Sequence, residues 1–230
     1  MTFADQVINF TRNLHLPDIA LPDGFEWLFP YDNPETMHAL TTFYERFYAD
    51  NQVRTIIFGI NPGRFGAGVT GVPFTDPVRL ETECGIRNDF PKKPELSSVF
   101  VWQFINAYGG ASAFCRDFYI TSLSPLGFVK DGKNINYYDD RHLQTAAEPF
   151  IAWNIRTSLD FGAQREAAIC LGEGKNFAFF QKLNATHGFF KEIVPLSHPR
   201  WIMQYRRKQV EEFVERYVEV LNQNSFRRSQ

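Results

Sequence analysis

Two polar side chains that could act on a bound molecule directly follow apolar stretches of the chain. Asn61 comes after the run 53–60, and His198 comes after the run 192–197. An amide oxygen can accept a hydrogen bond from water and so orient it, but an amide cannot take up the proton. A histidine before a proline at a strand end is, taken alone, more often structural than catalytic. The two residues become candidates only if the rest of the chain places them in one site.

The segment around Asn61 is rich in glycine, with five glycines among residues 59–71. Glycine lets backbone approach another group closely or adopt a positive φ. A phosphate-binding P-loop is excluded, because no Gly-Lys-Ser or Gly-Lys-Thr ends the segment. Residues 66–71 match the dinucleotide pattern Gly-x-Gly-x-x-Gly, but the match starts several residues after the expected strand, and Pro77 should stop a helix from following it. We interpret this match as accidental, which leaves an irregular loop or another kind of binding loop.

Apolar runs of strand length alternate with helical patterns along the chain. Strands are predicted at 53–60, 118–123, 167–172 and 192–197, and helices at 3–14, 34–48, 97–108, 140–159, 175–183 and 210–221. Near-continuous runs of Ile, Val and Phe are typical of a parallel sheet covered on both faces, and the alternation predicts an α/β fold with three α/β/α layers. The irregular interval 61–96 follows the first strand, where open α/β sheets bind ligands, which favours a functional role.

The composition predicts one domain over 1–230 with a frayed tail at 224–230. The chain has 230 residues, of which 44% are hydrophobic, enough for a single core. The net charge of −2 does not point to nucleic acid. The three cysteines lack metal-site spacing, so we expect buried reduced thiols and no metal. Without a signal-peptide layout or a membrane-length apolar run, we expect a cytoplasmic protein that does not contact membranes.

Several segments, in the same order, resemble the single-strand-selective monofunctional uracil-DNA glycosylases. Residues 59–63 (Gly-Ile-Asn-Pro-Gly), 65–66 (Phe-Gly) and 70–74 (Thr-Gly-Val-Pro-Phe) closely resemble the first active-site motif of the family. Residues 120–126 are similar to the strand that carries its base-recognition residue, 132–134 to the turn after it, and 196–200, with His-Pro, to its second motif. The first motif is highly specific. The resemblance spans about 53–205 and implies strand order 2-1-3-4 and excision of damaged bases from DNA without a cofactor.

By this resemblance, Asn61 and His198 are the catalytic residues. Hydrolysis of an N-glycosidic bond needs an oriented water and a donor to the departing base, which leaves as an anion. Asn61 would orient the water rather than act as a general base. His198 would donate to the base oxygen that gains charge, and neither a neutral nor a charged ring is excluded.

The resemblance also assigns residues that bind the base. Phe74 would stack on it, and Ile60 and Gly63 would line its pocket, with Gly63 leaving room for 5-substituted uracils such as 5-hydroxymethyluracil. The family has Asn where this chain has Ser122. The serine hydroxyl can donate or accept a hydrogen bond, and the smaller side chain leaves a larger pocket. This substitution resembles the second, bacterial subgroup of the family, for which uracil and xanthine are the implied substrates.

DNA should contact Arg64, Arg200 and Trp201, since an enzyme that binds DNA transiently needs only a local basic surface. The family has a longer insert after the second motif, which forms a wedge into the duplex. Here the segment is shorter, so Trp201 or Met203 could be an apolar wedge, although a helix with Trp201 in the core fits equally well. Arg206, Arg207 and Lys208 could meet phosphates or form a solvated helix face.

Two other functions fit the same loop. One is a hydrolase of free nucleosides or nucleotides, and the other is an inactive relative that keeps the fold and binds nucleic acid without turnover. Salt-dependent binding to single-stranded DNA would separate DNA-binding proteins from the first, and release of free base would separate an enzyme from the second. For the glycosylase, the expected partner is single- or double-stranded DNA that contains a deaminated base. We expect a monomer.

Overall fold

Four nearly continuous apolar strands form a parallel sheet at the centre of the molecule. The computed structural model describes residues 1–225. The strands are β2 (Arg54–Gly59), β3 (Phe118–Ser122), β6 (Ala163–Leu171) and β7 (Glu192–Leu196). Their order is β3-β2-β6-β7, and all three pairs are parallel. This confirms both the predicted α/β sandwich and the order 2-1-3-4.

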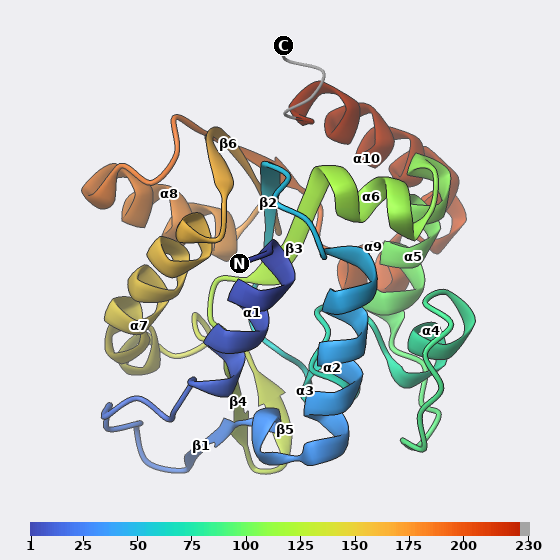
Figure 1. Cartoon of the computed structure of the whole chain (residues 1–230). Coiled ribbons are helices and arrows are strands. Elements are labelled where there is room, and N and C mark those ends of the chain that lie inside the picture. The colour runs from blue at the N-terminus through green and yellow to red at the C-terminus, as the bar shows by residue number, and fades with distance from the viewer. Residues whose placement is uncertain (226–230) are drawn as a thin grey trace.

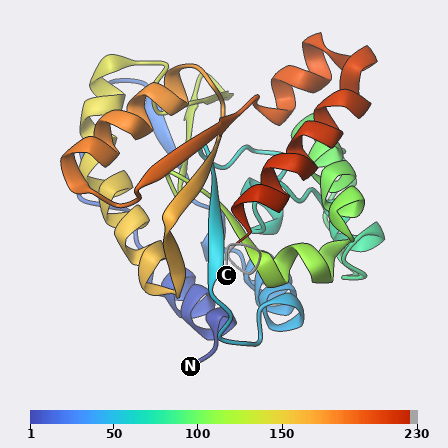
Figure 2. The ribbon, with the colours of Figure 1, turned by 90° about the horizontal axis from the view of Figure 1, so that it is seen from above.

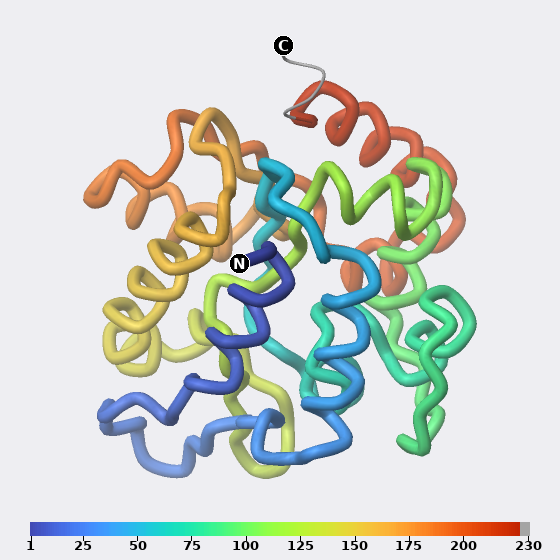
Figure 3. Tube along the Cα trace, in the orientation of Figure 1, coloured from blue at the N-terminus to red at the C-terminus, as the bar shows by residue number. Residues whose placement is uncertain are grey.

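Helices cover both faces of this sheet, as Figures 1 and 2 show. One face carries α7 (Arg141–Asp160) and α8 (Lys175–His187), and the other carries α5 (Leu96–Tyr108), α6 (Ala111–Asp117) and α10 (Val210–Asn224). Near the β3 edge, α1 (Phe3–Arg12) lies between α7 and α2 (Pro34–Phe47), as the trace in Figure 3 shows. The predicted helices are therefore all present, and none among residues 1–225 combines the length and apolarity needed to span a bilayer.

A second, smaller sheet was not predicted from the sequence. The antiparallel strands β1 (Phe25–Leu28), β4 (Gly127–Lys130) and β5 (Lys133–Ile135) form it in that order, at the bottom of the view in Figure 1. The turn expected at 132–134 lies slightly earlier, because Asp131 and Gly132, both at positive φ, connect β4 to β5, and Lys133 and Asn134 already belong to β5. This hairpin brings β5 close to the loop that follows β2.

The interval 61–96 holds two short helices, α3 (Ala67–Thr70) and α4 (Pro77–Thr82). The third glycine of the dinucleotide-type pattern, Gly71, ends α3 at φ +72° instead of starting a helix. Pro77 does not interrupt a helix, as the sequence suggested; it is the first residue of α4, which Asp76 caps. Proline is well tolerated there, because the first helical N–H needs no partner.

The amino-terminal end of β2 carries the fully buried Arg54. Its guanidinium donates to the carbonyls of Cys115 at 2.6 Å and Gln52 at 3.0 Å, and pairs with Asp50 at 2.9 Å. The same group lies over the rings of Phe3 and Tyr48, 4.7 and 4.8 Å from their centroids. Through Phe3 of α1 and Tyr48 at the end of α2, this cluster packs both helices against the start of β2.

The carboxyl-terminal segment ends against the sheet as far as it is described. The carbonyl of Asn224, the last residue of α10, accepts a hydrogen bond of 2.7 Å from the Thr55 hydroxyl. Ser225 is buried, and the rest of the expected tail, 226–230, lies outside the described residues. The three cysteines are buried free thiols, as predicted.

Candidate active site

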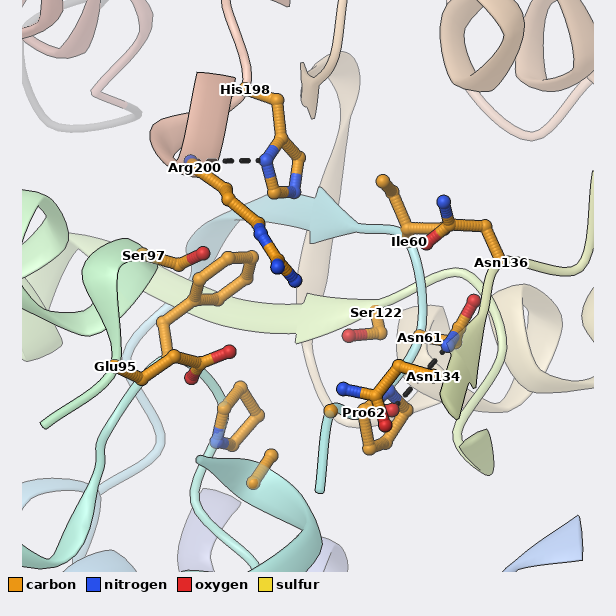
Figure 4. Close-up of a pocket in the computed structure, with 14 residues that line it drawn as sticks. Ile60, Asn61, Pro62, Glu95, Ser97, Ser122, Asn134, Asn136, His198 and Arg200 are labelled. Atoms are coloured by element: carbon orange, nitrogen blue, oxygen red, sulfur yellow. Dashed lines mark hydrogen bonds between the residues drawn. The ribbon is translucent and has the colours of Figure 1, made fainter. Parts of the chain in front are cut away.

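A polar pocket lies at the carboxyl ends of the parallel strands, between the loop after β2, the end of β3 and the start of α9 (Pro199–Tyr205). It is partly open to solvent. Figure 4 shows its lining side chains. Seven predicted site residues line it, although the first and the last are 140 positions apart in sequence: Ile60, Asn61, Gly63, Phe74, Ser122, His198 and Arg200. Arg64 and Trp201 lie outside it.

The Asn61 amide is held in one orientation by the backbone around it. Its Nδ2 donates to the carbonyls of Pro62 at 3.3 Å and Ile135 at 3.2 Å, and its Oδ1 accepts from the Tyr137 N–H at 3.2 Å. The partners fix which end of the amide is oxygen, because Tyr137 can only donate and the carbonyls can only accept. One lone pair of Oδ1 remains available to a water molecule.

His198 is a neutral histidine whose tautomer follows from its hydrogen bond. It caps α9, and its Nδ1 accepts a bond of 3.2 Å from the Arg200 N–H. Burial of the ring, with a smaller effect of the Arg200 charge, lowers the pKa of His198 to about 4. With Nδ1 accepting, the ring proton is on Nε2, the nitrogen that points into the pocket in Figure 4. The ring is therefore a hydrogen-bond donor toward the pocket at neutral pH.

Phe74 forms an aromatic wall of the pocket and has an unusual backbone. Its φ is +54°, a conformation that few residues other than glycine adopt. Its ring lies against Gly59, where an added β-carbon would be only 2.6 Å from two ring atoms. The centroids of the Phe74 and His198 rings are 6.3 Å apart. Strained backbone of this kind concentrates at functional sites.

Ser122 ends β3 with its hydroxyl unused by described residues. Its backbone carbonyl and that of Leu123 both accept 3.0 Å bonds from Nδ2 of the buried Asn154 on α7. Beyond the strand, Leu123 N–H donates to the Gly59 carbonyl at 3.1 Å. The backbone at 122 is thus fixed from two sides, while its Oγ stays free to bond a ligand.

Glu95 lines the pocket and was missed from the sequence. Its N–H donates to the buried Asp76 carboxylate at 2.8 Å, and its side chain lies so close to Gly66 that a β-carbon there would be 2.0 Å from Oε2. Burial, together with the charge of Asp76, raises the pKa of Glu95 to about 7 against the opposing effect of Arg200. The Glu95 carboxyl accepts no hydrogen bond from described residues. No local signal marks it, since it is far from Asn61 in sequence.

Two asparagines of the β5 segment also line the pocket and were not predicted. Asn134 Oδ1 accepts a 3.2 Å bond from the Arg64 N–H, which ties β5 to the loop after β2. Asn136 lies beyond β5, on the same side of the pocket as Asn61 in Figure 4. A β-carbon on Gly63 would be 3.3 Å from both Asn134 Nδ2 and Glu95 Oε1, so this glycine leaves open the space between them.

Of the residues expected to contact DNA, Arg200 lines the pocket, whereas Arg64 and Trp201 do not. The Arg200 side chain runs from the start of α9 into the pocket (Figure 4), and Arg64 lines an adjoining groove. The alternative that put Trp201 in the core is wrong, because 40% of its side chain is exposed and Arg206 lies 4.9 Å from its ring centroid. Met203 cannot act as a wedge, because its side chain, on the buried face of the short helix α9, is packed in the core. No metal-binding group of three His, Cys, Asp or Glu residues occurs within 1–225.

The arrangement can bind a flat, polar ring and assist its departure. Phe74 offers a stacking face, Ser122 and Asn134 offer donors and acceptors for a ring edge, and the His198 N–H can stabilise negative charge. Asn61 Oδ1 can orient water. Among the residues that line the pocket there is no lysine, so no amine is present there to form a Schiff base.

Comparisons with known proteins agree with this arrangement. The family model described as the uracil DNA glycosylase superfamily matches residues 46–222. The crystal structure of wild-type SMUG2 from Pedobacter heparinus is similar to the whole chain, with a TM-score of 0.95 and 46% sequence identity. That similarity covers 96% of this chain and 97% of the other. No curated protein sequence matched the chain.

Proposed function

This chain belongs to the uracil DNA glycosylase superfamily and is a DNA glycosylase, a hydrolase of N-glycosyl bonds, and we propose that it excises uracil and xanthine from DNA in base excision repair. The observation that carries the proposal is the pairing, in one pocket, of a backbone-oriented Asn61 amide with the Nε2–H donor of a neutral His198. In this proposal the nucleotide flips out of the strand and its base enters the pocket.

In the proposed reaction Asn61 holds the attacking water. The bond between C1′ and the base nitrogen breaks with its electron pair on the base, positive charge builds on the sugar, and the water oxygen bonds to C1′. An amide cannot accept the water proton, which passes to solvent. The three backbone hydrogen bonds of Asn61 support this role, because they keep its oxygen from exchanging places with its nitrogen.

His198 stabilises the departing base. Its Nε2–H donates to the base oxygen on which negative charge develops, as a donor in an oxyanion hole does. The neutral ring suits this role, because it gives a hydrogen bond without needing a proton from solvent. With no lysine in the pocket, the proposed product is free base and an uncleaved abasic strand.

The range of bases that the pocket accepts depends on four other lining residues, Phe74, Ser122, Gly63 and Ile60. The base stacks on Phe74, and the free Ser122 hydroxyl can donate to or accept from its edge by rotating, which is compatible with both uracil and a deaminated purine such as xanthine. Gly63 leaves the adjoining space open, so we extend the proposal to 5-hydroxymethyluracil. Ile60 lines the same pocket.

DNA rather than a free nucleoside is the proposed substrate. Arg200 lines the base pocket and Arg64 lines the adjoining groove, so a DNA strand can contact both, whereas a free nucleoside ends within the pocket. Trp201, which follows Arg200 in the chain, is exposed, and the Arg206 guanidinium lies 4.9 Å from its ring centroid. A hydrolase of free nucleosides is the competing function, since the pocket itself would fit either.

The deciding experiment compares uracil in a single-stranded oligonucleotide with free deoxyuridine and deoxyuridine monophosphate. Mass spectrometry would follow free uracil and the strand. We expect uracil release from the oligonucleotide, with the abasic strand intact until treated with alkali, and no release from the small molecules. Faster release from deoxyuridine than from the oligonucleotide would overturn the proposal.

A further inference from the structure

A groove next to the base pocket includes residues to which the proposed reaction assigns no role, among them Phe65, Leu96 and Lys133. It is partly open to solvent and runs between the loop after β2, the segment before α5 and the β4–β5 hairpin. Arg64, Phe65, Leu96 and Lys133 belong to the groove alone. Glu95, Asn134 and Arg200 line both it and the base pocket, so the two spaces are continuous.

An exposed aromatic ring lies in this groove between two cations. Phe65 is 44% exposed although most of the phenylalanines in the described chain are packed in the core. The Arg64 guanidinium and the Lys93 ammonium each lie 5.3 Å from its ring centroid. Such a ring, with positive charge beside it, is how proteins bind single-stranded nucleic acid, by stacking a base and contacting its phosphate.

The cations that line the groove outnumber its one acid, Glu95, whose charge interacts with that of Arg200. The Arg64 Nε is buried and has no hydrogen-bond partner among the described residues. Lys133 is exposed and forms no ion pair in the described chain. The protein as a whole carries a net charge of −2, so four cations around one groove (Arg64, Lys93, Lys133 and Arg200) are a local excess that favours an anionic ligand.

We propose that this groove is a subsite for the nucleotide next to the flipped one in single-stranded DNA, with its base stacked on Phe65 and its phosphate at Arg64 and Lys133. The inference rests on the proposed function, because a strand whose base occupies the pocket must leave through a neighbouring surface. Continuity through Asn134 and Arg200 makes this groove such an exit. Because any base can stack on an aromatic ring, this subsite would bind the neighbouring nucleotide whatever its base.

The test removes the ring and the neighbouring base separately. Single-stranded oligonucleotides would contain one uracil flanked by normal nucleotides or by an abasic tetrahydrofuran residue on the 5′ or the 3′ side. Single-turnover rates and binding constants would be measured for the wild-type protein, Phe65→Ala and Phe65→Trp. Leu16→Ala, which truncates another exposed apolar side chain, is the control.

We expect Phe65→Ala to weaken binding of the fully based strand about 5- to 150-fold, the range for one base stacked on an aromatic side chain, and Phe65→Trp to preserve it. An abasic neighbour on one side should weaken wild-type binding by a similar factor and Phe65→Ala hardly further, because both changes remove the same contact. Equal losses for Phe65→Ala on every strand, or no effect of an abasic neighbour on either side, would overturn the proposal. A larger loss on duplex than on single strands would identify Phe65 as a duplex wedge and also overturn it.

The phosphate contact has its own test. Lys133→Gln should reduce the slope of log binding constant against log salt by about one, whereas Lys182→Gln, an exposed lysine on α8, should leave it unchanged. An unchanged slope for Lys133→Gln would contradict the phosphate assignment. Failure of the proposed function would look different, since the strands would then bind with the same dependence on the neighbouring base but release no uracil.

Discussion

The polar groups near the two ends of β2 differ in whether the protein itself satisfies their hydrogen bonds. At the amino end, the buried Arg54 guanidinium uses its donors on two carbonyls and a carboxylate, and aromatic rings flank it. At the carboxyl end, the Ser122 hydroxyl and the Glu95 carboxyl bond to no described residue, and the Nε2–H of His198 faces open pocket.

We infer from this difference that the amino end of β2 contributes mainly to stability and the carboxyl end mainly to function. A buried charge that is fully paired costs little to keep and much to disturb. Buried polar groups without partners lower stability, so a protein retains them where a ligand completes their hydrogen bonds. The strained Phe74 backbone and the raised pKa of Glu95 belong to the same end. Changes at the amino end should therefore alter folding, and changes at the carboxyl end should alter excision.

Arg54→Ala should produce the largest loss of stability. It leaves the Cys115 carbonyl without its donor and opens a cavity between Phe3 and Tyr48, so we expect about 3–5 kcal/mol of destabilisation in urea unfolding. The folded fraction should excise uracil at the wild-type rate. A loss below about 1 kcal/mol, or a slow but stable variant, would break the comparison.

His198→Ala should slow release of every accepted base by about 10²–10³-fold, because it removes the donor to the anion that all of them form. Single-turnover rates with uracil and xanthine would check this, and the exposed His142→Ala serves as the control. The free energy of unfolding should change far less in His198→Ala than in Arg54→Ala. Wild-type rates in His198→Ala would return this residue to a structural role.

Ser122→Asn should change specificity rather than overall rate. An Asn amide supplies a donor and an acceptor matched to uracil, and its volume shortens the space for a purine. A mismatched base would leave buried polar groups unpaired, at about 1–3 kcal/mol each. We expect the ratio of uracil to xanthine release, measured in one sequence context, to rise. A flat ratio with both rates intact would mean that residue 122 does not touch the base.

Glu95→Gln should have the smallest effect, and it should depend on pH. The folded-state pKa of about 7 lies above the unfolded value of 4.5, so folding favours the protonated acid, and wild-type stability falls as pH rises from about 4.5 to 7. Glu95→Gln lacks this loss and should be more stable than wild type at pH 8 by about 1–2 kcal/mol, with little difference near pH 4.5. Urea unfolding at both pH values would check this, and equal stabilities at pH 8 would contradict it.

The same residue should shape the pH profile of excision. Above pH 7 the ionised Glu95, with Asp76 adding negative charge and Arg200 opposing it, disfavours an anionic leaving base. We expect the wild-type single-turnover rate to decline through about pH 7, and the Glu95→Gln rate to stay flat from pH 5 to 8, because His198 titrates near 4. An inflection near 6.5 in Glu95→Gln would show that His198 carries an ordinary pKa.

The sequence predicted the parts that depend on local pattern. The four strands and the helices follow from apolar runs and 3.6-residue periodicity, and most residues of the base pocket belong to the motifs that resemble the family. The second sheet was missed, because its strands have only three or four residues each and β1 pairs with β4 across about 100 residues of chain. Asn134 enters the pocket from β5 of this sheet, and Glu95 enters it from the residue before α5; neither placement leaves a periodic signal in the sequence.

The exposure of individual side chains near the second motif was equally unpredictable. Trp201 and Met203 are two residues apart on α9, and the rotation of that helix decides that the first is exposed and the second buried. The His198 tautomer depends on an N–H two residues later in the chain, which only the helix cap brings to the ring. Resemblance names such residues, but their protonation and exposure come from packing.

The central claim, that Asn61 orients water for hydrolysis at the carboxyl end of β2, is tested most directly by Asn61→Ala. Single-turnover uracil release and binding to a uracil-containing single strand would be measured at one salt concentration, with Asn106→Ala, an exposed asparagine on α5, as control. We predict that Asn61→Ala loses orders of magnitude in rate and binds the strand nearly as well as wild type, because the water contact acts mainly in the transition state. Weakened binding with an unchanged rate would contradict the account.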